Sequence, residues 1–290
     1  MRVMIFGAGY SGQAIGAELL SAGASVAGTT RSEDKAAHLR QSAIRPFLFD
    51  GHAISDGLRT ELRETTHLIQ SIAPGSAGDP VLMLSGDRLL DLMPKLEWCA
   101  YLSTVGVYGD HEGGWVDEDT LCKPVSARSR ERVAAEDGWI TAAMRDALPL
   151  AILRLSGIYG PGRNGFINLA EGNARRLVKP GQVFNRIRVE DIARATRFLA
   201  DRKADGIFNV TDHEPAPPQD VVTEAARIMG VAPPPEQAFE TAELSPMARS
   251  FYGENKRVSN EKIRNLGFSF RYPDYRVSLR QLWDDGRWRA

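Results

Sequence analysis

The segment Gly7–Gly12, with the sequence GAGYSG, constrains the fold of this chain more than any other short stretch. It follows Arg2–Phe6, a short apolar run, and it precedes the amphipathic stretch Gln13–Ala22, which Gly23 ends. An apolar run, a glycine-rich turn and an amphipathic stretch in this order predict a strand, a tight turn and a helix. In that context the pattern GxGxxG is typical of a dinucleotide-binding unit in an α/β fold.

Each glycine of the pattern has its own role in such a unit. Gly7 permits the tight turn, Gly9 lets the backbone approach a pyrophosphate, and Gly12 lets the helix pack closely on the strand. The helix N-terminus then offers unpaired N–H groups to the phosphates. The alternative is a glycine-rich turn that binds no ligand. The predicted cofactor contacts in this loop are Gly7, Gly9, Tyr10, Ser11 and Gly12.

The chain beyond this unit continues to alternate between strand-like and helix-like segments. Further strand candidates are Ser25–Thr29, Phe47–Phe49, His67–Ile72, Trp98–Ser103 and Ala151–Leu155, and helical candidates between them include Glu33–Gln41 and Asp79–Leu92. Strands that alternate with helices predict an α/β fold, here a Rossmann-type doubly wound parallel sheet.

The pattern changes after about Gly160. Helical candidates at Ile167–Leu177, Asp191–Ala200 and Gln219–Met229 are mixed with short strands at Val183–Val189 and Ile207–Val210. We predict a Rossmann domain over residues 1–160 and a smaller substrate lobe over residues 161–290, with some elements returning to the Rossmann sheet. Asp191 is expected to cap a helix, and Trp283 and Trp288 are expected to pack the C-terminal helix onto the domain.

The end of the second predicted strand bears on the choice of cofactor. An NAD-binding unit is expected to carry an acidic residue there for the ribose hydroxyls, and this chain has Thr29-Thr30-Arg31-Ser32. A carboxylate would repel a 2′-phosphate, whereas Arg31 and neighbouring hydroxyls such as that of Thr30 could bind it through charge-assisted hydrogen bonds. This favours NADP over NAD. The alternative is a surface arginine that begins the next helix.

Composition excludes several classes of function. A formal net charge of −1 gives no basic surface for nucleic acid or an anionic membrane, and no stretch is apolar over a length that could span a bilayer. The cysteines, Cys99 and Cys122, have no metal-ligand spacing and are too few for a disulfide framework. We therefore expect a cytoplasmic protein with a small-molecule substrate, no metal, no nucleic-acid partner and no membrane partner.

Four ordered motifs are more specific than the glycine loop. They are LSTVGVYGD at residues 102–110, LRLSGIYGPGR at 153–163, RIRVEDIARA at 186–195 and GIFNVTDHEPAP at 206–217. Together they resemble the motifs of extended short-chain dehydrogenases/reductases, the NAD-dependent epimerase/dehydratase family. The resemblance implies a nicotinamide cofactor at the carboxyl ends of the strands.

The resemblance also implies roles for individual residues. Thr104 falls at the position of the family's catalytic Ser/Thr, and Asp50 at the acidic position that usually contacts adenine. Ser71, Ile72 and Ala73 match the loop beneath the cofactor ribose. Ser156, Gly157 and Tyr159 match the loop beside the nicotinamide.

The stretch 123–136, KPVSARSRERVAAE, matches the family's catalytic helix but lacks its usual pair of residues. Where the family has Tyr-x-x-x-Lys, this chain has Ser126 and Arg130, with Ser129 at the place of a serine that often precedes the lysine. Serine needs a neighbouring base to move a proton, and arginine can hold ribose hydroxyls but does not give up its proton. Arg128 and Arg132 are read as solvated. The glycine spacing also departs from the extended family's GxxGxxG, so the chain resembles an atypical subgroup.

Two hypotheses about function follow. The first is an NADP-dependent oxidoreductase or epimerase acting on a small substrate, nucleotide-linked or hydroxylated, with Thr104 at the substrate oxygen and Arg130 on the ribose. Its proton donor would be Tyr108, Tyr159, Ser126 or a water molecule. The second is a cofactor-binding sensor or regulatory protein that has lost the chemistry.

The remaining implications of the resemblance concern the substrate lobe and assembly. Arg163, Arg186 and Arg188 could line an anionic substrate pocket, because the family often binds nucleotide-linked sugars through arginines of this lobe; Arg163 and Arg188 are the candidates we select. Members of the family often pair through helices that flank the sheet, so the resemblance also implies a homodimer.

Overall fold

A computed structural model describes residues 1–86 and 88–290. Its central sheet has seven strands in the order β11-β7-β5-β4-β1-β2-β3, and the pairs from β3 through to β5 are parallel. The strands are β1 (Arg2–Phe6), β2 (Ser25–Thr30), β3 (Arg45–Leu48), β4 (His67–Gln70), β5 (Trp98–Thr104), β7 (Leu150–Leu155) and β11 (Gly206–Val210). The predicted doubly wound α/β fold is therefore confirmed.

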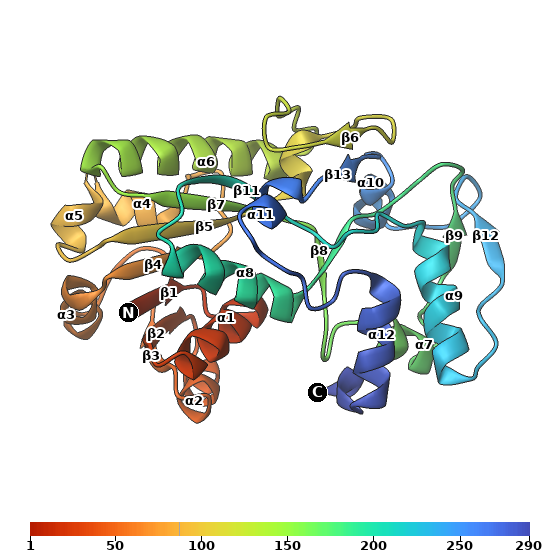
Figure 1. The fold of residues 1–290 in the computed structure, drawn as a ribbon, viewed down its shortest axis with the longest axis horizontal. Helices are drawn as coiled ribbons and strands as arrows, with labels where there is room; N and C mark the ends of the chain where they lie inside the picture. The colour runs from red at the N-terminus through yellow and green to blue at the C-terminus, as the bar shows by residue number, and fades with distance from the viewer. Residues whose placement is uncertain (87) are drawn as a thin grey trace. The chain divides into compact units, whose positions relative to one another are not determined.

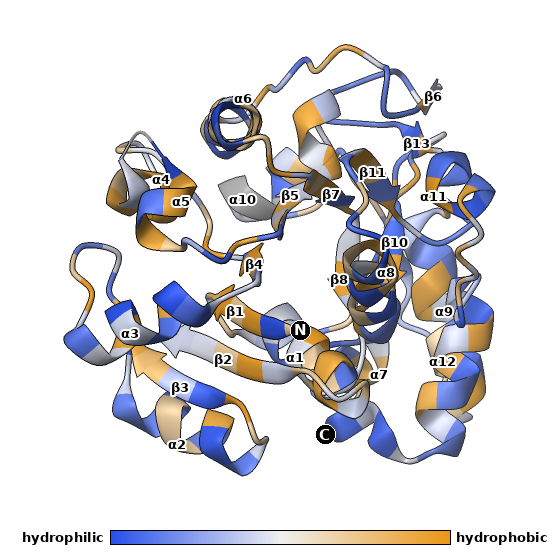
Figure 2. Cartoon of the chain, turned by 60° about the vertical axis from the view of Figure 1, so that its left-hand side comes forward, coloured by the Kyte–Doolittle hydropathy of each residue, from blue (hydrophilic) through white to orange (hydrophobic). Residues whose placement is uncertain are grey.

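The helices that accompany this sheet are α1 (Tyr10–Ser21), α2 (Glu33–Gln41), α3 (Asp56–Glu64), α4 (Pro80–Ser85), α5 (Leu89–Leu92), α6 (Ala127–Asp146) and α8 (Val189–Asp201) (Figure 1). Hydrophobic residues run along β1, whereas α2 and α3 are largely hydrophilic (Figure 2). This contrast arises because central parallel strands are buried on both faces, while the helices bury only one side.

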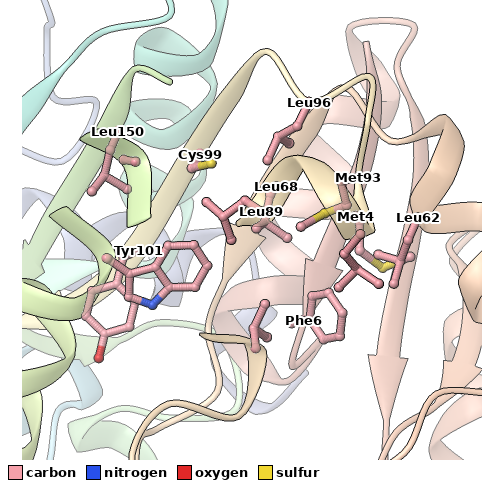
Figure 3. Packing of buried hydrophobic residues seen from close by; sticks show 14 of the residues in the cluster. Met4, Phe6, Leu62, Leu68, Leu89, Met93, Leu96, Cys99, Tyr101 and Leu150 are labelled. Atoms are coloured by element: carbon pink, nitrogen blue, oxygen red, sulfur yellow. The ribbon is translucent and has the colours of Figure 1, made fainter. Parts of the chain in front are cut away.

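The chain forms two compact units. The first comprises residues 1–107, 124–154 and 192–208, and the second comprises residues 108–123, 155–191 and 209–290. The core of the first unit includes Met4 and Phe6 of β1, Leu68 of β4 and Met93, which converge in Figure 3 and are all fully buried. This packing fixes the carboxyl ends of β1, β4 and β5 relative to one another.

The second unit contains short strands and helices. They are β6 (Trp115–Val116), β8 (Gly157–Tyr159), β9 (Arg176–Val178), β10 (Arg186–Arg188), β12 (Glu236–Ala238), β13 (Arg257–Val258), α7 (Gly165–Ala170), α9 (Pro218–Met229), α10 (Pro246–Phe251), α11 (Glu261–Asn265) and α12 (Tyr275–Asp284). Its core centres on Phe166, whose ring lies 5.3 Å from that of Trp283, and Trp288 stacks on Trp283 at 5.8 Å. The predicted packing role of the two tryptophans is confirmed.

Two predicted helices are wrong in extent, each for a local reason. The helix predicted over Asp79–Leu92 is divided into α4 and α5, because Gly86 takes a φ of +60° after Ser85; residue 87 lies outside the described residues. The helix predicted over Ile167–Leu177 ends as α7 at Ala170, before Gly172 at a φ of +70°. Its last residues instead enter β9, which pairs with β12.

Asp191 is not the helix cap that the sequence predicted. Helix α8 begins at Val189, so Asp191 lies in its first turn, and the carboxylate is completely buried. It accepts hydrogen bonds from Arg271 N at 2.9 Å and Tyr272 N at 2.8 Å. The residue thus anchors the segment before α12 by binding two backbone N–H groups.

Candidate functional site

The glycine loop between β1 and α1 is held in a single tight conformation. Gly7 has a φ of +84°, and a side chain on it would lie 2.9 Å from Ile72 Cγ1. A Cβ on Gly12 would lie 2.8 Å from Gly7 O. Gly7 N donates to Thr29 Oγ1 at 2.9 Å, so the loop is also tied to β2. These two glycines are required by the fold of the protein itself.

Gly9 has no such steric reason to be glycine. It is exposed, and a Cβ on it would meet only Gly7 O, at 4.0 Å. Gly9 is also the N-cap of α1 and provides no side-chain cap, and the first hydrogen bond of the helix runs from Gln13 N to Gly9 O at 2.8 Å. The N–H groups of Ser11 and Gly12 thus have no acceptor within the helix. This bare helix start with an open glycine fits the pyrophosphate of a dinucleotide.

The loop of residues 71–73 after β4 lies directly against the glycine loop; its contact with the cofactor ribose stays a prediction. Ser71 N donates to Phe6 O at 2.9 Å, and Ile72 N donates to Gln70 Oε1 at 3.1 Å. The amide of Gln70 is fixed in turn by the carboxylate of Asp79, at 2.8 and 2.9 Å. Ser71 and Ile72 are half-buried and Ala73 is exposed. The buried Gln70–Asp79 pair therefore sets the shape of this part of the site.

The end of β2 presents an unengaged cation. Thr29 is buried and its hydroxyl is used by Gly7, whereas Thr30 is half-buried and Arg31 is exposed. Among residues 1–86 and 88–290, the Arg31 side chain has no hydrogen-bond or ion-pair partner. Ser32 is the N-cap of α2 and makes no side-chain capping bond. These groups could receive a phosphate without breaking an internal contact.

Asp50 lies at the same edge of the sheet, because Phe49 N donates to Thr30 O at 2.9 Å. The Asp50 carboxylate is exposed and accepts from His52 N at 3.0 Å, which lowers its pKa. It is therefore an ionised acceptor beside β2, where the resemblance places the adenine contact.

Three hydroxyl groups gather near the end of β5. Ser126 Oγ caps α6 by accepting from Ser129 N at 3.0 Å, and it lies 2.9 Å from Ser129 Oγ. A Cβ on Gly106 would lie 3.3 Å from Ser129 Oγ and 3.4 Å from Thr104 Oγ1. The structure thus brings Thr104, Ser129 and Ser126 together around Gly106. Ser129 is buried; its position before Arg130 in the sequence was the signal for it.

Two arginines of α6 make contacts that the sequence did not predict. Arg130 is exposed and its Nη1 donates to Val125 O at 2.7 Å, so it closes the first turn of its own helix. Arg132, predicted to be solvated, is half-buried and its Nη1 donates to Leu102 O at 2.6 Å. The same atom donates to Tyr101 Oη at 3.2 Å. Residue spacing on one helix could not reveal this, because the contact lies on β5.

A buried ionic group fastens α6 to the sheet beneath these hydroxyls. Glu136 of α6 and Arg154 of β7 form an ion pair at 2.8 Å, and each side chain is only 4% exposed. Ser103 of β5, next to Thr104, donates its hydroxyl to the same carboxylate. The group holds the start of α6 and the end of β5 in one arrangement.

The predicted proton donors of the second unit differ in their surroundings. Tyr108 is fully buried and its hydroxyl donates to Asn209 Oδ1 at 2.7 Å. Tyr159 is half-buried, and its buried hydroxyl has no hydrogen-bond partner among the described residues. Burial raises the pKa of Tyr159, so it remains protonated at neutral pH. Beside it, Ser156 is buried and Gly157 is exposed.

The structure gives Arg188 a structural role in place of the predicted substrate contact. Its guanidinium pairs with Glu190 at 2.6 and 2.8 Å, and Nη1 donates to the backbone and hydroxyl of Ser278 at 3.1 and 3.0 Å. A further bond from Nη2 to Gln281 uses its last donor, and the side chain is inaccessible to solvent. Arg163 is exposed, and its substrate role stays a prediction.

A surface pocket lies away from the glycine loop. This pocket of about 360 Å³, lined by Arg2, His67, Glu97 and Lys203, opens at the amino edge of the sheet, opposite the glycine loop. Within residues 1–86 and 88–290 no cluster of three or more His, Cys, Asp or Glu side chains is arranged for a metal, and no helix is long and apolar enough to cross a membrane.

Comparisons with known proteins agree with this geometry. A family model described as "NAD dependent epimerase/dehydratase family" matches residues 3–211. Protein YeeZ of Escherichia coli K12 is 28% identical over 285 residues, which cover 94% of this chain and 97% of YeeZ. A conserved protein of unknown function from Silicibacter pomeroyi is 45% identical, with a TM-score of 0.91 and 99% of each chain covered. A putative NAD-dependent epimerase/dehydratase from Methylobacillus flagellatus is 26% identical, with a TM-score of 0.74 and coverage of 99% and 98%.

Proposed function

Since this chain belongs to the NAD dependent epimerase/dehydratase family, we propose that it binds a nicotinamide dinucleotide, with NADP preferred, and carries out a redox step on a small hydroxylated substrate. The observation that carries the proposal is Gly9, a glycine whose side-chain space is open and which begins a helix without a cap. A side chain there would obstruct only a ligand, because no atom of the loop needs the room.

Different residues around Gly9 bind different parts of the dinucleotide in this proposal. The N–H groups at the start of α1 receive the pyrophosphate, Arg31 and Ser32 receive the 2′-phosphate, and Asp50 accepts from the adenine. When bound, the nicotinamide accepts or supplies the hydride. The loop of residues 71–73, held by Gln70, lies under the ribose.

Proton movement in this proposal uses the hydroxyl group around Gly106. Thr104 hydrogen-bonds the substrate oxygen, and Ser129, which lies with Thr104 around Gly106, contacts Ser126 through serine hydroxyls that are 2.9 Å apart. A relay of this kind passes a proton between the substrate and solvent without requiring any serine to become an alkoxide for long. Arg130, the residue after Ser129, adds positive charge near these hydroxyls. Its side chain reaches the ribose only by giving up its hydrogen bond to Val125 O.

The competing function is a cofactor-binding sensor without turnover. The observation that favours it is that both residues at the places of the family's tyrosine and lysine already serve α6, since Ser126 caps the helix and Arg130 binds Val125 O. Residues with structural tasks of this kind need not have been retained for chemistry.

A nucleotide titration separates these functions. Thermal unfolding measured with NADPH, NADP, NADH and NAD reports binding, because a ligand of the folded state raises its melting temperature. We expect the largest shift with NADPH or NADP. No shift with any of the four would contradict cofactor binding. Turnover is then assayed with a panel of sugars, aldehydes and ketones: activity lost in Thr104→Ala and Ser129→Ala supports the enzyme, and tight binding without turnover of any of them supports the sensor.

A further inference from the structure

Strands β8 and β10 of the second unit build a polar face that the cofactor does not account for. They pair in parallel, with Gly157 beside Arg186 and Tyr159 beside Arg188. Because side chains alternate along a strand, Arg186 and Tyr159 belong to the same face. Gly157 puts no side chain on that face, and its backbone is exposed. Asp212 joins the group from the next segment, since Asp212 N donates to Arg186 O at 2.8 Å.

Two buried polar atoms of this face lack hydrogen bonds. Tyr159 Oη and Asp212 Oδ2 have no partner among residues 1–86 and 88–290, although Asp212 is only 1% exposed. Ser278 lies near enough to Tyr159 Oη to lower the pKa of Tyr159, but its hydroxyl does not meet the geometry of a hydrogen bond with Tyr159 and already accepts from Arg188. The other oxygen of Asp212 accepts from Glu214 N at 3.1 Å.

The guanidinium of Arg186 is only partly used. Its Nη1 donates to Phe184 O at 2.9 Å and to Ala216 O at 3.1 Å, and in the described part of the chain Nε and Nη2 make no hydrogen bond. No carboxylate among the described residues lies within the 4.0 Å of an ion pair with it. The Nε and Nη2 edge is the side-on fork with which arginine binds a carboxylate or phosphate bidentately. A half-buried cation thus keeps its anion-binding edge unoccupied.

Unsatisfied buried polar groups are costly, and proteins retain them mainly where a ligand or a function satisfies them. Here a cation edge, a phenol and a carboxyl share one face whose floor is a glycine. Burial raises the pKa of Asp212 well above its ordinary range, which favours the protonated form that donates a hydrogen bond. The face then offers donors for an anion and for neighbouring oxygens.

We propose that Arg186, Tyr159 and Asp212 form the binding site for the polar end of the substrate, a small hydroxylated anion whose carboxylate or phosphate takes the free edge of Arg186. The hydroxyls of that ligand pair with Tyr159 Oη and Asp212 Oδ2. The assignment rests on the proposed function in that it names the substrate class, but the site itself lies wholly within the second unit.

Stability tests the unpartnered state of Tyr159. Tyr159→Phe removes a hydroxyl that bonds to nothing, so the variant is expected to unfold at the same or a higher temperature than the wild type. Tyr108→Phe is the matched change in the same unit; it removes a hydroxyl bonded to Asn209 and is expected to lower the melting temperature. Equal losses in both variants would show that Tyr159 Oη has a structural partner and would overturn the assignment.

Ligand binding tests the site directly. D-gluconate supplies the carboxylate, D-glucose 6-phosphate the phosphate, and sorbitol a neutral polyol, each titrated calorimetrically at millimolar concentration with and without NADPH. We expect one or both anions to bind and sorbitol not to bind. Arg186→Gln and Tyr159→Phe are each expected to lower the affinity for the anion roughly tenfold or more. Arg227→Gln, which changes an exposed arginine of α9, is expected to leave that affinity unchanged.

The outcomes separate this inference from the cofactor proposal. Binding of neither anion, or binding that Arg186→Gln and Tyr159→Phe leave intact, overturns the site even when NADPH binds normally. An intact anion site in a protein that no nucleotide stabilises contradicts the cofactor proposal and leaves the site standing. The carboxylate and phosphate titrations together tell which anion the substrate carries.

Discussion

At the scale of single residues, the three glycines of the motif differ in whether the protein leaves room for a side chain. Gly7 and Gly12 are required by contacts within the protein, at 2.9 Å to Ile72 and 2.8 Å to Gly7 O, whereas Gly9 has open space. The same letter in the pattern therefore marks a folding constraint at two positions and, under the proposed function, a ligand constraint at the third.

Gly9→Ala is expected to leave the stability of the ligand-free protein within about 0.5 kcal/mol of wild type while weakening NADPH binding. The reason is that the added methyl occupies only the space of the pyrophosphate. Gly12→Ala is the control, and its clash with backbone is expected to cost about 1–3 kcal/mol. Urea unfolding and NADPH titration measure both effects. Undiminished NADPH affinity in Gly9→Ala would refute the assigned role.

We propose that the preference for NADP over NAD depends on Arg31. Arg31→Ala is expected to lower the affinity for NADPH about tenfold, because a charge-assisted contact is lost, and to leave the affinity for NADH nearly unchanged. Arg40→Ala is the matched control, because Arg40 is an exposed arginine on the adjoining helix α2 with only a 3.9 Å pair to Glu33. Fluorescence titration of both reduced nucleotides decides the matter. Parallel losses for NADPH and NADH would mean that Arg31 does not read the 2′-phosphate.

His67 makes the stability of the protein depend on pH. It lies in β4, is 4% exposed, and burial lowers its pKa from an ordinary 6.5 to about 4. Between those values the unfolded chain binds more protons than the folded one, so the free energy of unfolding rises with pH and reaches its full value above 6.5. The whole effect is about 3 kcal/mol. Urea unfolding measured across this pH range should show that the free energy of unfolding rises less steeply with pH in His67→Gln than in wild type. His52→Gln, which changes an exposed histidine, should keep the wild-type pH dependence.

At the scale of elements, helix α6 is positioned by a buried ion pair as well as by an apolar face that contains Ala135, Trp139 and Ala143. Glu136, Arg154 and Ser103 connect it to β7 and β5, while Ser129 brings a hydroxyl beside Gly106. Several arginines of the helix face solvent, so the residues that locate it are a minority of its sequence.

Removing one partner of this group should cost more than removing both. Glu136→Leu leaves the Arg154 charge buried without Glu136, Arg154→Met leaves the Glu136 charge buried without Arg154, and each is expected to destabilise the protein by roughly 3–5 kcal/mol. The double variant Glu136→Leu with Arg154→Met leaves no buried charge and is expected to recover much of that loss. Denaturant unfolding of the two single variants and the double variant completes the cycle. Simple additivity of the single effects would show that the pair is not coupled.

At the scale of the whole molecule, helices α4 and α6 leave apolar side chains on the surface. Met83 is 58% exposed, Met144 76% and Ile140 36%. The two helices pack on each other, since a Cβ on Gly138 of α6 would lie 2.9 Å from Leu82 Cδ1 of α4. Ile140 and Met144 are four residues apart and so lie on one side of α6. We propose that two copies of the chain pair through these flanking helices.

Pairing of this kind predicts a concentration-dependent mass in solution. Met144→Lys is expected to shift the protein from dimer to monomer in light scattering after size-exclusion chromatography, because it places a charge in an apolar contact. Val277→Lys, a similarly exposed apolar residue on α12, is the control. A wild-type protein that stays monomeric at high concentration would exclude the pairing.

The sequence by itself determined the alternation of strands and helices in the Rossmann sheet and the position of the glycine loop, because each depends on local periodicity or on a turn that only glycine permits. It also located Ser126 and Arg130, although not what they bind. Only the tertiary structure showed that Arg132 contacts β5, that Arg188 is saturated by Glu190, Ser278 and Gln281, and that Asp212 joins Tyr159 and Arg186. Those contacts join residues far apart in the chain, and no pattern within a segment encodes which distant donor a side chain will meet.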